Sequence, residues 1–222
     1  DFSELGTHAE FLGVRSKAVM LAEYFIRDGE GAMKEWRIKG HALVPFWRWV
    51  ATWGAVVKRP SDLGHDDAGF ALPPLRMHDH VVPIGADEVR AAGRLFADDA
   101  LTLGEQRAVR RSTIEKRAAL AAKICDGDEP AVVWVDLNDE GDVVTEMISG
   151  AVQVAGSDDR DDKESRLVGF SEGTHRVMVS KVSLAGFGLN WQHCRKVVFI
   201  GASHSYEQTY QAIRRCWRFG QT

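Results

Sequence analysis

The chain has 222 residues, of which 45% are hydrophobic and 27% are charged, and these values are typical of a globular protein. This composition excludes a disordered tail, a collagen-like fibre and a coiled coil. No apolar run approaches the roughly 20 residues that a membrane-spanning helix needs, so we expect no membrane partner.

The formal net charge of −4 conceals an uneven distribution of charge along the chain. Residues 126–172 contain 14 acidic and 3 basic side chains, whereas residues 173–222 contain 7 basic side chains and 1 acidic side chain. A basic C-terminal block beside an acidic one is consistent with a site for phosphates. Charge alone favours the simpler alternative, which is two solvated faces of opposite sign.

The cysteines stand far apart, at Cys125, Cys194 and Cys216, with no C-x-x-C pair. This spacing fits reduced thiols and predicts a cytoplasmic location. Nothing near Asp1 resembles a signal peptide. The first residue is not Met and the sequence stops at Thr222, so we expect a piece of a longer protein.

Residues 1–125 are predicted to be mainly helical. Ser16 can cap a helix that runs to Ile26 and ends at Gly29. A second helix is predicted over residues 41–57, where apolar and aromatic residues recur near a 3.6-residue period.

Two more elements are predicted before residue 125. Residues 75–82 alternate apolar with polar side chains, which predicts a strand. Residues 103–124 are dense in Arg, Lys, Glu and Ala, which predicts one long helix.

Four tryptophans, Trp36, Trp47, Trp49 and Trp53, fall within 18 residues. Trp47 and Trp53 share a face with the apolar residues of the predicted helix, which favours a role in the core. Trp49 is predicted to point away from that stripe. It is therefore the candidate for an aromatic platform that stacks nucleobases.

From residue 130 onward, short apolar runs alternate with amphipathic segments. The predicted strands cover residues 131–135, 151–155, 176–180 and 196–200, and the predicted helices cover residues 139–148, 161–170 and 206–219. Strand–helix–strand units with continuously apolar strands imply a parallel sheet with helices on both faces.

The histidines do not form a convincing metal site. His78 and His80 could point the same way from a strand, but the sequence places no third ligand beside them, and His193 and Cys194 have no partner either. We therefore predict no bound metal. The chain also lacks a G-x-S-x-G motif and any Gly-Lys dipeptide, so it cannot form a Walker A phosphate loop.

A G-x-G pattern at Gly186 and Gly188 follows a predicted strand. A dinucleotide-binding fingerprint also follows a strand, but its third glycine is missing here. The pattern alone is therefore more typical of a tight turn.

The last predicted helix carries Gln211, Arg214, Arg215 and Arg218 at spacings of three or four residues, which places them along one face. Neighbouring guanidinium groups repel each other unless an anion lies between them, and a phosphate chain is a natural partner. The alternative is a basic surface helix, against which the nearby aromatic residues argue.

This helix resembles part of a known family. Residues 210–221, YQAIRRCWRFGQ, resemble motif VI of superfamily 2 helicases and Swi/Snf-type translocases, in which Q-x-x-x-R-x-x-R commonly ends in G-Q. The matching residues are Gln211, Arg215, Arg218, Gly220 and Gln221.

Segments upstream match the same family in order and spacing. Residues 180–190, SKVSLAGFGLN, resemble motif V, whose G-x-G-x-N ends at Asn190. Residues 131–136 look like the motif IV strand. Motif V is about two residues longer than in the Swi/Snf pattern, so nucleotide contacts are not carried over to residues 181–185.

The front of the chain is also similar to this family. Residues 1–13 look like the segment after motif III, and residues 72–74, LPP, look like a Swi/Snf-type linker. As a whole the chain resembles phage or prophage helicases cut after motif III. The resemblance implies an α/β fold with a second RecA-like lobe at 126–222, preceded by a mainly helical linker or insertion at 1–125.

For the active site, the resemblance implies a motor that uses ATP and Mg²⁺, both held mainly by the absent first lobe. Arg215 and Arg218 would be arginine fingers that neutralise charge on the transferring phosphoryl group, and Gln211 would position them or the attacking water. Glycines 186 and 188, together with Asn190, would form the nucleotide-binding loop.

For partners, the resemblance implies sequence-independent binding of single- or double-stranded DNA, with Ser180 and Lys181 as contacts, and an interface with the first lobe. The expected location is the cytoplasm of a bacterium or a phage-infected host. A non-catalytic module that keeps the helicase fold stays open as an alternative, and so does an RNA-directed helicase.

Overall fold

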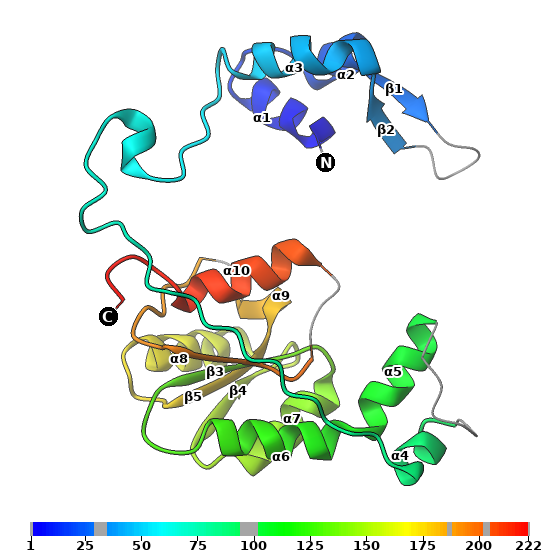
Figure 1. Ribbon diagram of the computed structural model, residues 1–222, viewed down its shortest axis with the longest axis vertical. Helices are drawn as coiled ribbons and strands as arrows, with labels where there is room; N and C mark the ends of the chain where they lie inside the picture. Colours follow the sequence, from blue (N-terminus) through cyan, green and yellow to red (C-terminus); the bar gives the residue numbers. More distant parts are fainter. Residues whose placement is uncertain (1, 29–34, 94–101, 186–187, 202–204, 222) are drawn as a thin grey trace. The chain divides into compact units, whose positions relative to one another are not determined.

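The computed structural model describes residues 2–28, 35–93, 102–185, 188–201 and 205–221. The chain divides into two compact units, Asp1–Asp66 and Asp67–Thr222 (Figure 1). The functional division predicted at residue 125 lies elsewhere in the chain and stays a prediction. No helix among the described residues is long and apolar enough to cross a membrane.

The first unit combines short helices with a β-hairpin. Its elements are α1 (Leu5–Phe11), α2 (Lys17–Tyr24), α3 (Leu43–Val50), strands β1 (Phe25–Asp28) and β2 (Glu35–Ile38), and 3-10 helices at Phe2–Glu4, Gly40–Ala42 and Pro60–Leu63. A core of aromatic and aliphatic side chains, centred on Phe46, holds it together.

Helix α2 begins where the sequence predicts, because the Ser16 hydroxyl accepts a hydrogen bond from the Val19 backbone N–H at 3.4 Å. It ends earlier than predicted. Phe25 and Ile26 leave the helix for β1, which pairs antiparallel with β2. The β-propensity of these residues, together with burial of Phe25 against Phe46, prevails over the helical period.

Helix α3 covers only the first half of the helix predicted over residues 41–57. The prediction for Trp49 is wrong, because its ring stacks on Tyr24 with centroids 5.6 Å apart, whereas Trp47 is 41% exposed. Trp49 lies one turn from the buried Phe46 and shares its face, while Trp47 lies on the adjacent outer surface.

In the second unit, the segment predicted as a strand at residues 75–82 is irregular. It alternates as a strand does, but no strand among the described residues pairs with it, and Met77 and Val81 stay exposed. The predicted long helix at 103–124 is interrupted at Thr113, whose hydroxyl donates hydrogen bonds to the backbone carbonyls of Val109 and Arg110. Such bonding competes with the helical pattern.

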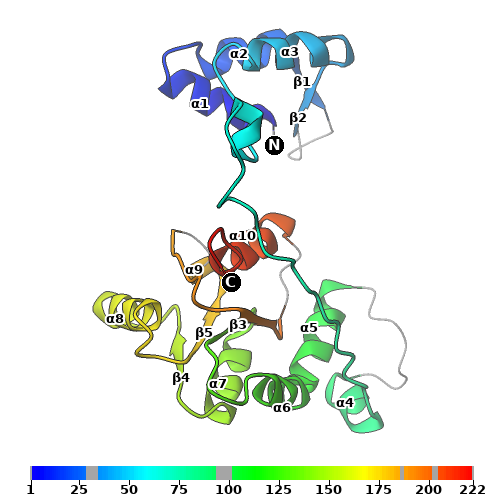
Figure 2. The ribbon, with the colours of Figure 1, turned by 60° about the vertical axis from the view of Figure 1, so that its left-hand side comes forward.

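The second unit is built on a four-stranded parallel sheet of order β4–β5–β3–β6 (Figure 2). Its strands are β3 (Ala131–Val135), β4 (Ala151–Val154), β5 (Val177–Lys181) and β6 (Lys196–Phe199). Its helices are α4 (Ala86–Ala91), α5 (Leu103–Ser112), α6 (Ile114–Ile124), α7 (Asn138–Met147), α8 (Arg160–Ser171), α9 (Val182–Ala185) and α10 (Tyr206–Cys216). Each strand and helix predicted after residue 130 is present, although α10 ends three residues before the predicted end.

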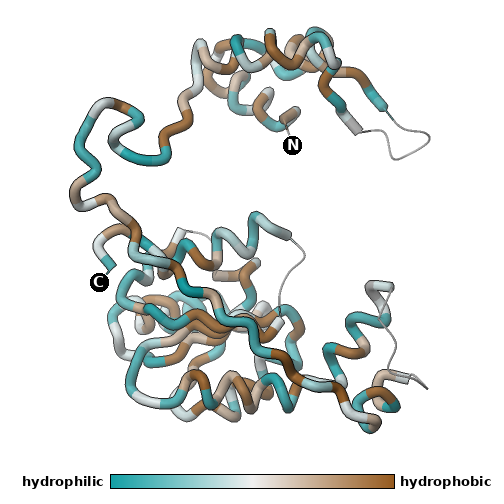
Figure 3. Tube along the Cα trace, viewed as in Figure 1, coloured by the Kyte–Doolittle hydropathy of each residue, from teal (hydrophilic) through white to brown (hydrophobic). Residues whose placement is uncertain are grey.

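Alternate residues of the central strands point to opposite faces of the sheet, and both faces are buried. Val133 and Val179 pack against α6 and α7, whereas Val132 and Met178 pack in the cluster that includes residues of α8, α9 and α10. Figure 3 shows the hydrophobic residues along these strands. The predicted α/β fold, a parallel sheet with helices on both faces, is therefore confirmed.

A buried ion pair fixes the carboxyl ends of β3 and β6. Glu140 is fully buried and pairs with Arg117 at 2.8 Å, and its other oxygen accepts hydrogen bonds from the backbone N–H groups of Asp136 and Leu137. Gly201 packs so closely that a Cβ there would collide with this carboxylate. The backbone at this edge of the sheet is thus held in one conformation.

Candidate functional site

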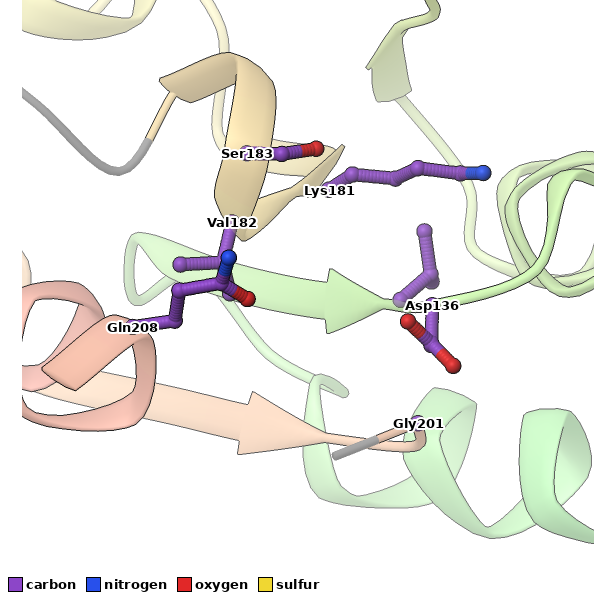
Figure 4. Close-up of a pocket in the computed structure, with 7 residues that line it drawn as sticks. Asp136, Lys181, Val182, Ser183, Gly201 and Gln208 are labelled. Carbon is purple, nitrogen blue, oxygen red and sulfur yellow. The ribbon is translucent and has the colours of Figure 1, made fainter. Parts of the chain in front are cut away.

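A pocket of about 280 Å³ opens at the carboxyl ends of the strands, where ligands bind in open α/β sheets. Its lining comes from the ends of β3 and β5, from α9 and α10, and from the segment after β6 (Figure 4). The lining residues are Val135, Asp136, Lys181, Val182, Ser183, Gly201 and Gln208.

Of the two charged side chains that line this pocket, one has an ion-pair partner and the other has none among the described residues. The Asp136 carboxylate accepts a hydrogen bond from Arg110 Nη1 at 3.0 Å, so its negative charge is neutralised from α5. The Lys181 ammonium has no ion-pair partner in the part of the chain that the structure describes. Ser183 and Gln208 add polar groups that can donate hydrogen bonds. The pocket can therefore hold an anion at Lys181.

Sequence reasoning identified Lys181 but gave no role to the other polar residues of the pocket. The sequence pattern places Asp136 only at the end of a predicted strand and Arg110 only within a predicted helix. The signal that could have found them is their position, since residues that follow parallel strands gather at one edge of the sheet.

Ser180, predicted as a nucleic-acid contact, is turned inward. Its side chain is buried, and its hydroxyl donates a hydrogen bond to the Val154 carbonyl at 3.0 Å, joining β5 to β4. Neighbouring residues of a strand face opposite sides, so Ser180 and Lys181 cannot both reach the pocket. The Ser180 hydroxyl therefore stabilises the sheet, and a nucleic-acid contact by this residue stays a prediction.

Arg215 also points into the protein and is only 5% exposed. It donates hydrogen bonds to the Leu189 carbonyl at 3.0 Å and to Gln211 Oε1 at 3.2 Å, and its own carbonyl accepts one from the Trp191 N–H at 2.9 Å. Burial, and to a lesser extent the nearby Arg218 charge, lower the pKa of Arg215. These bonds tie α10 to the segment that resembles motif V.

Arg214 and Arg218 lie nearer the surface than Arg215. Arg218 is half-buried, and its Nε donates a hydrogen bond to the Arg214 carbonyl at 3.0 Å. Arg214 lies over the rings of Trp217 and Phe219, 5.3 and 5.7 Å from their centroids. The arginines predicted to share one face are thus divided between the interior and the outer surface.

An extended segment far upstream holds the end of α10. The Trp217 indole N–H donates a hydrogen bond to the Pro73 carbonyl at 2.7 Å. The Phe70 ring packs edge-on against Phe219, with centroids 5.7 Å apart. We call residues 70–73 the strap. The sequence suggested a linker here but not that it packs against the arginine helix.

The glycines of the predicted nucleotide loop are only partly visible. Gly186 lies outside the described residues. Gly188 has φ of +79°, a left-handed conformation that favours glycine, and Asn190 accepts a hydrogen bond from the Gln192 N–H at 3.4 Å. Their part in nucleotide binding stays a prediction.

No group of three or more His, Cys, Asp or Glu side chains that could hold a metal ion occurs among the described residues. His193 and Cys194, considered as possible ligands from the sequence, lie beside the sheet core instead. The His193 ring packs against Phe170, and Cys194 is fully buried.

Residues 120–220 match the family described as the helicase conserved C-terminal domain. The match includes every strand of the four-stranded sheet, the pocket and α10. This part of the chain is therefore similar to a helicase C-terminal domain, and its parallel sheet with helices on both faces is consistent with the RecA-like fold.

Several solved structures are similar to the chain. The C-terminal part of the Fun30 ATPase domain is 19% identical, with a TM-score of 0.38, over 59% of this chain and 41% of that one. The RNA helicase Prp28 from Chaetomium thermophilum bound to ADP is 21% identical, with a TM-score of 0.40, over 47% of this chain and 26% of that one. T4 UvsW is 17% identical, with a TM-score of 0.43, over 53% of this chain and 26% of that one.

The matched part is less than half the length of each of these solved chains. No curated protein sequence matches the chain.

Proposed function

We propose that the chain contributes the second RecA-like lobe of an ATP-dependent DNA helicase or translocase. The observation that carries this proposal is the position of α10. This helix anchors Arg215 on the motif V-like segment, and Arg218 follows its last residue by two and is half-buried, within the part of the chain that matches a helicase C-terminal domain. We include in this proposal that the whole protein is a phage-like helicase related to Swi/Snf-type translocases.

In this proposal Arg218 is the arginine finger. Its guanidinium is half-buried and is held at Nε by the Arg214 carbonyl, so its terminal nitrogens can face a phosphoryl group across the interface between two lobes. A positive charge at that position stabilises the charge that develops during phosphoryl transfer, and it increases the rate by about a thousandfold or more.

Arg215 acts as a positioning residue. Both of its hydrogen-bonding partners are within the domain, at Leu189 and Gln211, so its burial favours a different task from that of Arg218. It keeps α10 and the motif V-like segment in a fixed relation. Gln211 is part of this arrangement and orients the Arg215 guanidinium.

ATP and Mg²⁺ supply the transferable phosphoryl group and the charge that neutralises it. The cationic Arg218 fits the phosphate end of ATP, whereas the described residues form no cluster suited to the metal. We therefore propose that a first RecA-like lobe holds Mg²⁺ and most of the nucleotide. On this basis the 222-residue chain alone hydrolyses ATP negligibly.

The nucleic-acid contact is assigned to the pocket at the carboxyl edge of the sheet. Lys181 offers an ammonium with no ion-pair partner among the described residues, and Ser183 and Gln208 offer hydrogen-bond donors elsewhere in the lining of the same pocket (Figure 4). These groups suit a backbone phosphate, which carries no sequence information. Binding through them is sequence-independent and weakens as salt rises.

The competing function is a non-catalytic binding module that keeps the helicase fold. The two proposals differ in what Arg218 does, since a binding module has no use for a finger. The test is ATP hydrolysis by the protein in which this chain is joined to the first lobe, measured with and without single-stranded DNA.

We expect Arg218→Ala to lower the DNA-stimulated turnover by about a thousandfold while changing KM little. The matched control is Arg160→Ala, which removes an exposed arginine at the start of α8 and leaves turnover unchanged. Turnover that survives Arg218→Ala would favour the binding module.

A further inference from the structure

The outer face of α10 carries a pair of exposed tyrosines that the proposed function has not used. Tyr206 is 82% exposed and Tyr210 is 44% exposed. They lie one helical turn apart, and their rings stack with centroids 6.1 Å apart and an angle of 21° between the planes. The two rings thus present nearly parallel aromatic surfaces to solvent.

The remainder of this outer row is covered by the protein itself. Arg214 follows Tyr210 by one turn and lies over Trp217 and Phe219, and the strap packs against these two aromatic residues. The aromatic residues after the end of α10, Trp217 and Phe219, are therefore covered by the strap, whereas Tyr206 and Tyr210 at its start are left open to solvent. Large exposed aromatic rings next to cations are typical of binding sites.

The surroundings of the pair indicate what could bind there. Gln208 lies between the two tyrosines in sequence and lines the pocket that holds Lys181. Residues two apart in a helix face nearly opposite sides, so the open aromatic surface and the pocket lie at the same end of α10 but on opposite faces of it, and a strand that contacts both passes around that end. Residues 173–222 carry 7 basic side chains against Glu207 alone; of these Arg215 is buried and Lys196 is paired with Glu129, whereas Lys181 and Arg218 have terminal nitrogens with no partner among the described residues and can meet an anion.

We propose that Tyr206 and Tyr210 stack with the nucleobases of a single-stranded nucleic acid whose backbone phosphates bind at Lys181. The inference rests on the nucleic-acid binding proposed above and adds a recognition element to it. Stacking suits any base, because every base has a π-face, so the site is tolerant of sequence. It requires unpaired bases, so the site distinguishes a single strand from a duplex.

The test measures binding of the 222-residue chain to a fluorescein-labelled oligothymidylate by anisotropy at several salt concentrations. We expect Tyr206→Ala and Tyr210→Ala each to weaken binding by about 5- to 100-fold at every salt concentration. Tyr206→Phe and Tyr210→Phe keep the rings and should bind as the unchanged chain does. Both tyrosines are exposed, so circular dichroism should show that the alanine variants stay folded.

Stacking and phosphate contacts differ in their dependence on salt. Tyr206→Ala and Tyr210→Ala should leave the slope of log affinity against log salt unchanged. Lys181→Ala should reduce the magnitude of that slope by about 1, as expected for the loss of one phosphate contact. A strand without bases cannot stack. It should therefore bind the unchanged chain no more tightly than oligothymidylate binds a variant that carries both Tyr206→Ala and Tyr210→Ala. If Tyr206→Ala and Tyr210→Ala both bind as the unchanged chain does, while Lys181→Ala reduces the salt slope as expected, the stacking role is overturned and the proposed function stays intact.

Two other outcomes would also overturn the inference. If the tyrosine variants lose affinity for ADP but not for the oligonucleotide, the rings bind the base of a free nucleotide. If the unchanged chain binds no oligonucleotide at low salt, the proposed nucleic-acid function fails together with the stacking role.

Discussion

The two faces of α10 use the same kinds of residue for different purposes. On the inner face, Ala212, Arg215 and Cys216 are buried against the sheet core. On the outer face, Tyr210 and Arg214 lie at or near the surface. An arginine on the inner face must find partners within the protein, whereas one on the outer face can exchange its partners for a ligand.

Arginine spacing alone therefore does not define a phosphate site. A buried guanidinium is tolerated only if hydrogen bonds compensate for the loss of water, and Leu189 and Gln211 provide them for Arg215. The same bonds restrict the side chain to one position. Arg218 is bonded only at Nε among the described residues, so its terminal nitrogens stay available.

The largest effect on the free energy of unfolding is expected when Arg215, the arginine on the inner face, is removed. Arg215→Ala leaves the Leu189 carbonyl and the Gln211 amide oxygen without their buried donor, so we expect the free energy of unfolding to fall by about 3 kcal/mol. Urea unfolding of the 222-residue chain, followed by circular dichroism, measures this change. A loss below about 1 kcal/mol would contradict the structural role of the inner face.

An intermediate effect is expected where the outer face meets the strap. Trp217→Phe keeps an aromatic ring but removes the hydrogen bond to the Pro73 carbonyl, which should cost about 1 kcal/mol. Hydrogen exchange should become faster in the last turn of α10 and unchanged in β3. Unaltered exchange in α10 would mean that the strap does not stabilise the helix.

The smallest effect on the free energy of unfolding is expected for Arg218, the proposed finger. Arg218→Ala removes a half-buried side chain with one hydrogen bond to the protein, so the free energy of unfolding should change by less than about 0.5 kcal/mol. Equal losses of stability for Arg218→Ala and Arg215→Ala would remove the distinction between the buried arginine of α10 and the half-buried arginine that follows the helix.

The parts of the structure that the sequence predicted are those that local pattern determines. The strand at residues 131–135 is a continuous apolar run between polar segments, because it is buried on both faces. The segment at 75–82 has the alternation of a strand, but pairing requires a neighbouring strand that no local pattern reveals. A strand needs a partner, whereas a helix satisfies its own backbone.

The candidate site was predictable to a similar extent. The resemblance to motifs V and VI indicated Lys181 and α10, and the structure brings both to the neighbourhood of one pocket edge. It could not indicate that Ser180 faces inward or that Trp217 bonds to Pro73, which lies 144 residues earlier. Those facts depend on packing between distant segments.

The most direct test of the central claim compares Arg215→Lys and Arg218→Lys in the protein that carries both lobes, with stability and DNA-stimulated ATP turnover measured on the same samples. Lysine keeps the charge at each position but lacks the forked donors of arginine. We predict that Arg215→Lys loses mainly stability, whereas Arg218→Lys keeps its stability and loses most of its turnover. Full turnover in a stable Arg218→Lys variant, or loss of turnover with full stability in Arg215→Lys, would contradict the separate roles of Arg215, on the inner face of α10, and Arg218, which follows the helix.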